Sequence, residues 1–153
     1  MSWLENRVPP PLVAALFAVV MWACSRGLPD LAIQVPGQRL VALSVLIAGA
    51  GVIAAAWARF ISARTTVNPL RPETASSLVT SGVFSLTRNP MYLGLALALL
   101  AWVLWLGNGA CALLLVGFVG YITRFQIAPE ERAMLVNFGE EFEAYARRVR
   151  RWL

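Results

Sequence analysis

The chain has 153 residues, of which 59% are hydrophobic and only 14% are charged. An average soluble domain contains roughly 45–50% apolar and about 25% charged residues, so this composition excludes an ordinary soluble protein. The mean hydropathy of +0.67 indicates that a lipid bilayer covers much of the surface. All 13 basic residues are arginines and histidine is absent, which excludes metal binding or catalysis by imidazole. Cys24 and Cys111 lie in separate apolar stretches, so neither a metal site nor a disulfide is expected.

Four apolar segments are candidates for membrane-spanning helices, because a hydrocarbon core of about 30 Å requires roughly 20 helical residues. The first is interpreted as an uncleaved helix, since the residues just before Cys24 are unlike those of a cleaved signal. The second carries no charge and is the clearest of the four. In chain order the segments are 12–28, 40–58, 91–106 and 110–122.

Only residues 107–109 separate the last two segments, which predicts a tight antiparallel helical hairpin. Beyond the fourth segment, apolar residues recur at steps of three and four, as in an amphipathic helix at a membrane interface. They are Leu135, Phe138, Phe142, Tyr145, Val149 and Trp152. The sequence therefore predicts an all-α polytopic membrane protein with four transmembrane helices and a C-terminal interfacial helix. It would form one domain over 1–153, with the first two helices within 1–61 and the other elements within 62–153.

The arginines are distributed unevenly around these spans, and arginine is enriched on the cytoplasmic side of membrane proteins. Placing both termini and the 62–88 loop on one side leaves only Arg26 and Arg39 on the other. We therefore predict an inner-membrane protein of bacterial type with cytoplasmic termini, and interpret the arginines of 147–151 as an anchor for anionic lipid. The arginines on that side are Arg7, Arg59, Arg64, Arg71, Arg88, Arg124, Arg132, Arg147, Arg148, Arg150 and Arg151.

The second span contains a group of small residues, Ala48, Gly49, Gly51 and Ala55. In a bilayer, small side chains allow two helices to approach closely. We expect this face to pack either within the protein or against a second copy. The sequence leaves the oligomeric state open.

A polar motif, Thr87, Arg88 and Asn89, leads into the third span at Pro90 and Tyr92. A structural interpretation is that Asn89 caps the helix, Pro90 occupies its first position and Arg88 extends to the membrane boundary. A functional interpretation stays open beside it. The same residues offer a cation, an amide, a phenol and a helix N-terminus.

A second polar cluster, made of Arg124, Gln126, Glu130 and Glu131, joins the fourth span to the tail. Pro129 followed by two glutamates is also typical of an ordinary helix start. Both clusters fall on the predicted cytoplasmic side, at the ends of neighbouring helices. They would surround a polar pocket open to lipid and cytosol, which suits a reaction between a charged, soluble cofactor and an acceptor dissolved in the membrane.

Two ordered blocks within about residues 59–153 carry a resemblance. The first is Leu78-Val79-Thr80-Ser81-Gly82-Val83-Phe84 followed by Arg88-Asn89-Pro90-Met91-Tyr92-Leu93-Gly94, and the second is Pro129-Glu130-Glu131, Leu135, Phe138-Gly139, Tyr145 and Arg151-Trp152. The first block resembles the cofactor-binding stretch of the isoprenylcysteine carboxyl methyltransferase family. The second resembles the C-terminal block of the same family.

This resemblance implies an integral membrane methyltransferase that uses S-adenosylmethionine at the cytosolic face to methylate a lipophilic acceptor. The first choice of acceptor is a carboxylate, such as that of an isoprenylated cysteine or a related small molecule. The alternatives are a phospholipid or small-molecule N- or S-methyltransferase and a non-catalytic membrane interaction protein. Membrane lipids are expected partners and nucleic acid is not. The implied cofactor contacts are Ser76, Ser77, Leu78, Val79, Phe84, Asn89, Pro90, Met91, Tyr92 and Glu130.

Three positions depart from the family pattern. They are Asn89 in place of histidine, Phe84 in place of tyrosine, and Gln126 in place of a substrate-binding arginine. The nearby Arg124 is therefore the candidate for orienting a carboxylate acceptor. A carboxylate is already ionised near neutral pH and requires no base. An amine or thiol acceptor would have to be deprotonated, for which Glu130 or Glu131 is the candidate.

Overall fold

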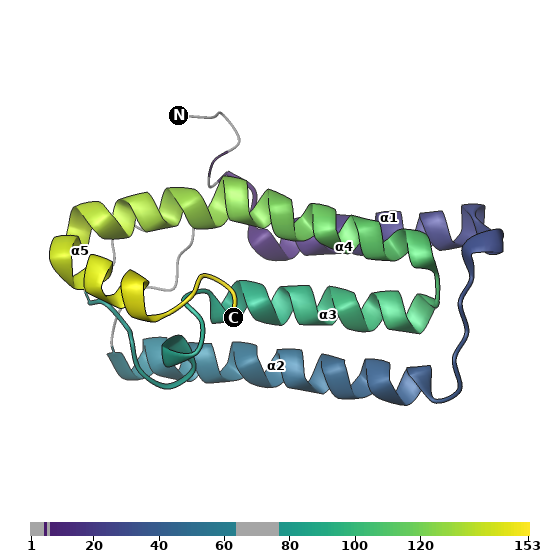
Figure 1. The fold of residues 1–153 in the computed structure, drawn as a ribbon, viewed down its shortest axis with the longest axis horizontal. Helices are drawn as coiled ribbons and strands as arrows, with labels where there is room; N and C mark the ends of the chain where they lie inside the picture. Colours follow the sequence, from purple (N-terminus) through teal and green to yellow (C-terminus); the bar gives the residue numbers. More distant parts are fainter. Residues whose placement is uncertain (1–4, 6, 64–76) are drawn as a thin grey trace.

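A computed structural model describes residue 5 and residues 7–63 and 77–153 (Figure 1). Within these residues most of the chain is helical, as expected for an all-α membrane protein. Four apolar helices form the body of the protein, and a more polar helix follows them. The five are α1 (Pro10–Gly27), α2 (Gln38–Ala63), α3 (Pro90–Leu106), α4 (Gly109–Ile122) and α5 (Ala128–Arg148).

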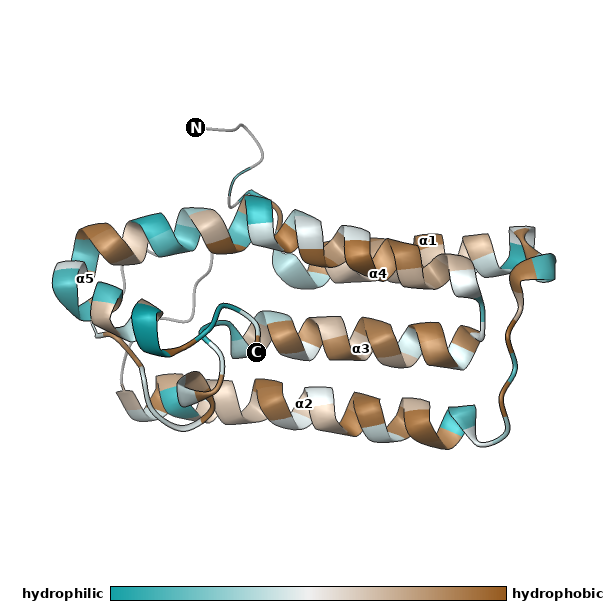
Figure 2. Cartoon of the chain, viewed as in Figure 1, coloured by the Kyte–Doolittle hydropathy of each residue, from teal (hydrophilic) through white to brown (hydrophobic). Residues whose placement is uncertain are grey.

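The apolar helices match the predicted spans closely. α1, α2 and the helix that contains α4 are long and apolar enough to cross a membrane, and α3 is a shorter apolar helix. Colouring by hydropathy shows the change from largely apolar helices to the more polar α5 (Figure 2). The prediction of a polytopic all-α membrane protein is therefore confirmed.

The junction between α4 and α5 differs from the expectation. Pro129 lies at the start of α5 with Glu130 and Glu131 in the first turn, as predicted, but α5 is not separate from α4, because one π-helical turn, Thr123–Ile127, joins the two helices directly. A proline inside a helix removes a backbone donor and crowds the preceding turn. The wider π turn just before Pro129 lets the helix continue past it.

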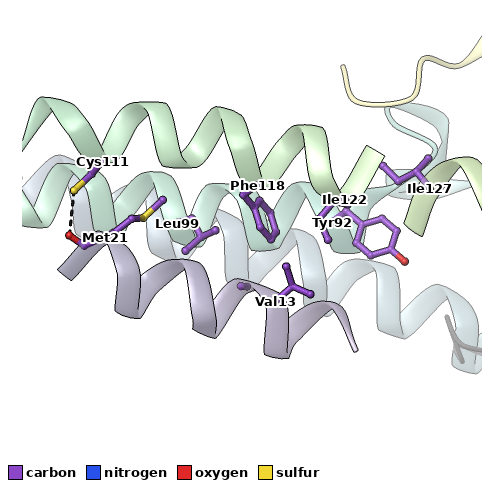
Figure 3. Packing of buried hydrophobic residues seen from close by; sticks show 9 residues of the cluster. Val13, Met21, Tyr92, Leu99, Cys111, Phe118, Ile122 and Ile127 are labelled. Atoms are coloured by element: carbon purple, nitrogen blue, oxygen red, sulfur yellow. Dashed lines mark hydrogen bonds between the residues drawn. The ribbon is translucent and has the colours of Figure 1, made fainter. Parts of the chain in front are cut away.

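α3 lies at the centre of the bundle and contacts α1, α2 and α4 (Figure 1). Buried side chains of α1, α3 and α4 form a row between these helices (Figure 3). At one end of the row the thiol of Cys111 donates to the carbonyl oxygen of Met21 at 3.3 Å. At the other end lie Tyr92, Ile122 and Ile127, so the buried row reaches the polar end of the bundle.

α2 and α3 approach closely at Gly49 and Gly94. A Cβ atom added to Gly94 would lie 2.9 Å from the carbonyl oxygen of Gly49 and closer still to Ile53. One added to Gly49 would lie 3.0 Å from the carbonyl oxygen of Gly94. The expected close packing through small residues is thus confirmed for Gly49. A Cβ atom on Gly51 would meet nothing within 4 Å, so that residue lies outside the contact.

Replacing Gly94 by alanine is expected to destabilise the protein. Overpacking a close contact costs about 1–3 kcal/mol, and the better helix propensity of alanine offsets about 1 kcal/mol of that cost. Gly51→Ala is the matched control, because its new methyl group meets open space. Thermal unfolding of both variants in detergent measures the difference. Equal unfolding temperatures would contradict the close contact.

α5 is bent at Gly139, whose φ of 49° lies in the left-handed region that favours glycine. Its second half turns back toward the end of the bundle (Figure 1), and its Phe142 and Tyr145 form one buried cluster with Val149, the residue that follows the helix. The predicted helical period of the tail is therefore present. Leu135 departs from the prediction because it stays 43% exposed, and Val149 and Trp152 depart from it because the helix ends at Arg148.

The two ends of the bundle differ chemically. At one end Asn108 holds the tight turn between α3 and α4: its side-chain oxygen accepts from the N–H of Ala110, and its amide donates to the carbonyl oxygen of Leu28 at 2.8 Å. At the other end lie the start of α3, the bent α5 and the C-terminus (Figure 1). The predicted hairpin is confirmed, and the compartment that each end faces stays a prediction.

Candidate active site

α3 begins at Pro90 with Asn89 in the N-cap position, as predicted. The side chain of Asn89 does not cap the helix, however. Its amide donates to the carbonyl oxygen of Arg151 at 2.9 Å. The hydroxyl of Thr87 donates to the same carbonyl and accepts from the N–H of Asn89, both at 3.2 Å. The expected capping role is wrong, because the C-terminal segment supplies an acceptor for the Asn89 amide.

The two predicted clusters meet at Tyr92 and Glu130. The hydroxyl of Tyr92, in the first turn of α3, donates to Oε1 of Glu130, in the first turn of α5. Tyr92 is only 6% exposed and belongs to the buried row together with Ile122 and Ile127 (Figure 3). The carboxylate of Glu130 therefore lies where the apolar core meets the polar end of the bundle.

Glu131 binds two arginines. Its Oε1 forms an ion pair with Nη2 of Arg88 at 2.9 Å and accepts from Nε of Arg151 at 3.1 Å, and its Oε2 accepts from Nη2 of Arg151 at 2.5 Å. Hydrogen bonding to Glu131 raises the pKa of Arg151. The side chain of Arg88 is only 14% exposed and is paired with Glu131, and its position relative to the membrane boundary stays a prediction. Both carboxylate oxygens of Glu131 are thus occupied.

Arg124 and Gln126 contact the segment before α1. Arg124 is 57% exposed, and its Nη1 lies 3.0 Å from Oε1 of Glu5. The other carboxylate oxygen of Glu5, Oε2, pairs with Arg132. Gln126 is fully buried, and its amide donates to the carbonyl oxygen of Val8 at 2.9 Å. These bonds tie the α4–α5 junction to the N-terminal segment, away from the bonds made by Glu131.

The loop before α3, predicted to contact the cofactor, packs against both α2 and α5. The hydroxyl of Ser77 donates to the carbonyl oxygen of Ala63 at 3.5 Å. Leu78 packs against the buried cluster of α5. Phe84 is 6% exposed, and its carbonyl oxygen accepts from the hydroxyl of Tyr145 at 2.7 Å. The loop is therefore held between the end of α2 and the second half of α5.

The remaining predicted cofactor contacts are Ser76, Val79, Pro90 and Met91. Pro90 is buried in the first turn of α3, and Val79 and Met91 are partly buried. Ser76 lies outside the described residues. The structure thus brings together the first turns of α3 and α5.

The donor set at this end fits a small zwitterionic ligand. Glu130 offers a carboxyl group beside the apolar core, and burial there raises its pKa to about 8. A cation such as a sulfonium beside it would favour the charged carboxylate, because charges attract more strongly in this environment than in water. Nε of Arg88 is buried without a partner in the part of the chain that the structure describes, and a guanidinium N–H suits an anionic group. The residues present therefore fit the zwitterionic cofactor that the resemblance implies.

Thr87 belongs to the predicted polar motif, whereas the sequence analysis does not predict Arg151 and Trp152 as residues of this site. Arg151 was grouped with the lipid anchor, whereas its side chain is 40% exposed and paired with Glu131. The indole N–H of Trp152 donates to the hydroxyl of Thr123 at 3.2 Å. Arg151 and Trp152 already occurred in the second resembling block, which was the one signal that could have identified them.

Comparison with known proteins identifies the family. The phospholipid methyltransferase family model matches residues 38–141, which is more than half of the chain. An uncharacterised protein of Haemophilus influenzae is 51% identical over 63 residues, which are 41% of this chain and the whole of that protein. No solved structure matches the chain. The chain therefore belongs to the phospholipid methyltransferase family, among the isoprenylcysteine carboxyl methyltransferase-like membrane methyltransferases.

Proposed function

We propose that this integral membrane methyltransferase transfers a methyl group from S-adenosylmethionine to a lipophilic acceptor beside Tyr92 and Glu130. The observation that carries the proposal is the hydrogen bond between these residues, which joins the first turns of α3 and α5. Each residue belongs to one of the two blocks that resemble the family, and both lie within the matched residues 38–141. The apolar helices around this end would let the acceptor approach from the bilayer.

The methyl donor requires no acid catalysis from the protein. When bound, S-adenosylmethionine supplies a methyl group on a sulfonium, and the thioether leaves neutral, so no proton need be donated to it. The protein must align donor and acceptor and exclude water; alignment corresponds to effective molarities of about 10⁵–10⁸ M. Glu130 attracts the positive charge, Tyr92 orients the carboxylate, and the buried row beside Tyr92 excludes water from that side.

The ion pairs of the arginines indicate which class of acceptor is favoured. Four arginines at this end of the bundle are engaged by Glu131 or Glu5, so a carboxylate acceptor would compete with a glutamate for a guanidinium group. They are Arg88, Arg124, Arg132 and Arg151. A lipid amine makes no such demand and agrees with the description of the matched family. We therefore place a lipid amine first and a carboxylate, with Arg124 as its partner, second.

An amine acceptor must lose a proton during the reaction. Glu131 and Glu130 are the candidates for this role from the sequence. Because both oxygens of Glu131 are bound by arginines, we propose Glu130 as the proton acceptor and Glu131 as a structural partner of Arg88 and Arg151.

Cofactor binding and acceptor identity can be tested on the detergent-purified full chain. Isothermal titration should show binding of S-adenosylmethionine. Incubation with methyl-labelled cofactor and either phosphatidylethanolamine vesicles or a farnesylcysteine analogue, followed by mass spectrometry, should place the label on the lipid amine. Label on the farnesylcysteine carboxyl group instead would show that the acceptor is a carboxylate and not a lipid amine. Failure to bind millimolar cofactor would favour the non-catalytic alternative.

A reporter fused after Leu153 should be active in the cytoplasm of a bacterial host. The reason is the enrichment of arginine at one end of the bundle. A pair of fusions, one reporter active only in the cytoplasm and one only in the periplasm, measures the orientation. Activity of the periplasmic reporter alone would show that the C-terminus faces the periplasm, opposite to the prediction.

A further inference from the structure

The last five residues, 149–153, form a segment that we call the C-terminal strap. It leaves α5 and passes the segment before α3 (Figure 1). The carbonyl oxygen of Arg150 accepts from the backbone N–H of Arg88 at 3.0 Å. The indole N–H of Trp152 donates to the hydroxyl of Thr123, in the π turn, at 3.2 Å. The strap is therefore fixed to both the α3 side and the α4 side of the bundle.

Arg151 lies between these two attachments and binds both halves of the candidate site. Its carbonyl oxygen accepts from the amide of Asn89 at 2.9 Å and from the hydroxyl of Thr87 at 3.2 Å. Its guanidinium group makes two hydrogen bonds to the carboxylate of Glu131. One residue thus connects the segment before α3 with the first turn of α5.

We propose that Arg151 is a positioning residue that holds these two segments in the arrangement that binds the cofactor. The inference rests on the proposed function, because it takes the first turns of α3 and α5 as the binding site. Glu131 is the chain neighbour of Glu130, so fixing its carboxylate also fixes the turn that presents Glu130. Two-point bonds between a guanidinium and a carboxylate are among the strongest and most directional that side chains make.

The other arginines of the tail are differently placed. Arg147 is 71% exposed and pairs at 3.5 Å with Glu143, one turn earlier on α5. Arg148 is exposed at the end of α5, before the strap. These residues suit the lipid anchor expected from the sequence, whereas the side chain of Arg151 is directed to Glu131. A change at Arg151 and the same change at Arg148 therefore separate positioning from lipid attraction.

The first test compares Arg151→Ala with the control Arg148→Ala in the detergent-purified full chain. Both substitutions remove one positive charge from the tail. Isothermal titration of S-adenosylmethionine, at a temperature where circular dichroism shows each variant folded, should give a dissociation constant at least about tenfold higher for Arg151→Ala. The control should stay within about twofold of the unaltered protein. Equal constants for the two variants would overturn the inference.

A second test uses a milder variant and does not depend on Arg151→Ala remaining folded. Arg151→Lys keeps the charge but loses the planar two-point geometry, so its affinity should fall between those of the unaltered protein and Arg151→Ala. If Arg151 acts through Glu131, adding Arg151→Lys to Glu131→Gln should weaken binding by less than about twofold more. Fully additive effects would overturn the inference.

The unaltered protein separates failure of this inference from failure of the proposed function. If it does not bind S-adenosylmethionine, the proposed function and the positioning role both fail. If it binds and Arg151→Ala binds equally well, only the positioning role fails. The titration thus gives a different result in each case.

Discussion

Glu130→Gln should weaken binding of S-adenosylmethionine by roughly tenfold to more than a hundredfold. Removing a hydrogen-bonded charge from a binding site costs about 1.5–3 kcal/mol, whereas the interaction of an exposed carboxylate with a helix dipole is worth only about 0.3–1 kcal/mol. Glutamine keeps the shape of the side chain, and its amide oxygen can still accept a hydrogen bond from the hydroxyl of Tyr92. The loss would therefore report the charge rather than the packing, and isothermal titration measures it.

Glu140→Gln is the matched control, because Glu140 is exposed on the same helix and its change removes the same charge. Its affinity should equal that of the unaltered protein. Tyr92→Phe removes the hydroxyl that holds Glu130 and should weaken binding in the same direction. If Glu130→Gln binds the cofactor as tightly as Glu140→Gln does, Glu130 does not belong to the site.

Local sequence patterns are sufficient for the helices and for the tight turn between α3 and α4, but not for the connection between α4 and α5 or for the bend of α5. Hydropathy identified α1 to α4, because each buries or exposes to lipid an almost continuously apolar segment. It did not show that the chain would continue past Pro129, since the π turn that accommodates this proline has no clear signature in the residues of 123–127. The bend of α5 at Gly139 is likewise set by how the second half packs against the loop before α3.

The candidate site was predictable where it depends on helix ends and not where it depends on distant partners. The tight turn between α3 and α4 brings Tyr92 and the segment around Glu130 to the same end, and this could be derived from the spacing of the spans. Arg124, in contrast, pairs with Glu5, 119 positions earlier. Asn89 pairs with a carbonyl 62 positions later. Neither helix period nor turn chemistry carries information over such separations.

Asn89→Asp should lower the stability of the protein, although local rules predict the opposite. Aspartate is as good as asparagine at a helix N-cap, and its charge would gain about 0.3–1 kcal/mol at the N-terminus of α3. The Asn89 side chain instead donates to the carbonyl oxygen of Arg151. A carboxylate at this position has no N–H to donate, and its oxygens would face the carbonyl oxygen of Arg151. Leaving a partly buried polar group unsatisfied costs about 1–3 kcal/mol. Because this cost is larger than the gain at the helix N-terminus, we expect Asn89→Asp to be less stable than the unaltered protein.

Thermal unfolding of two variants and the unaltered protein shows whether Asn89→Asp lowers or raises the stability. Asn89→Ala removes the donor without adding charge, so its unfolding temperature should lie between those of the unaltered protein and Asn89→Asp. Acidification below the usual aspartate pKa of about 3.9 should reduce the difference between Asp and Ala, because a protonated carboxyl group can again donate to the Arg151 carbonyl. Asn89→Asp with an unfolding temperature equal to or above that of the unaltered protein would restore the capping role.

Asn89→His tests whether the same position also contacts the cofactor. Both the neutral and the protonated imidazole carry an N–H that can donate to the Arg151 carbonyl, so the strap should stay in place and the protein should fold at any pH between about 5.5 and 8. If the ring only holds the strap, cofactor affinity should change little over this range. If it also faces the cofactor, protonation near an unperturbed pKa of about 6.5 adds a positive charge beside a sulfonium, and affinity should fall as the pH is lowered through that value. Parallel titrations of the unaltered protein and the variant measure the difference. A cofactor affinity that does not change with pH would show that residue 89 holds the strap and does not contact the cofactor.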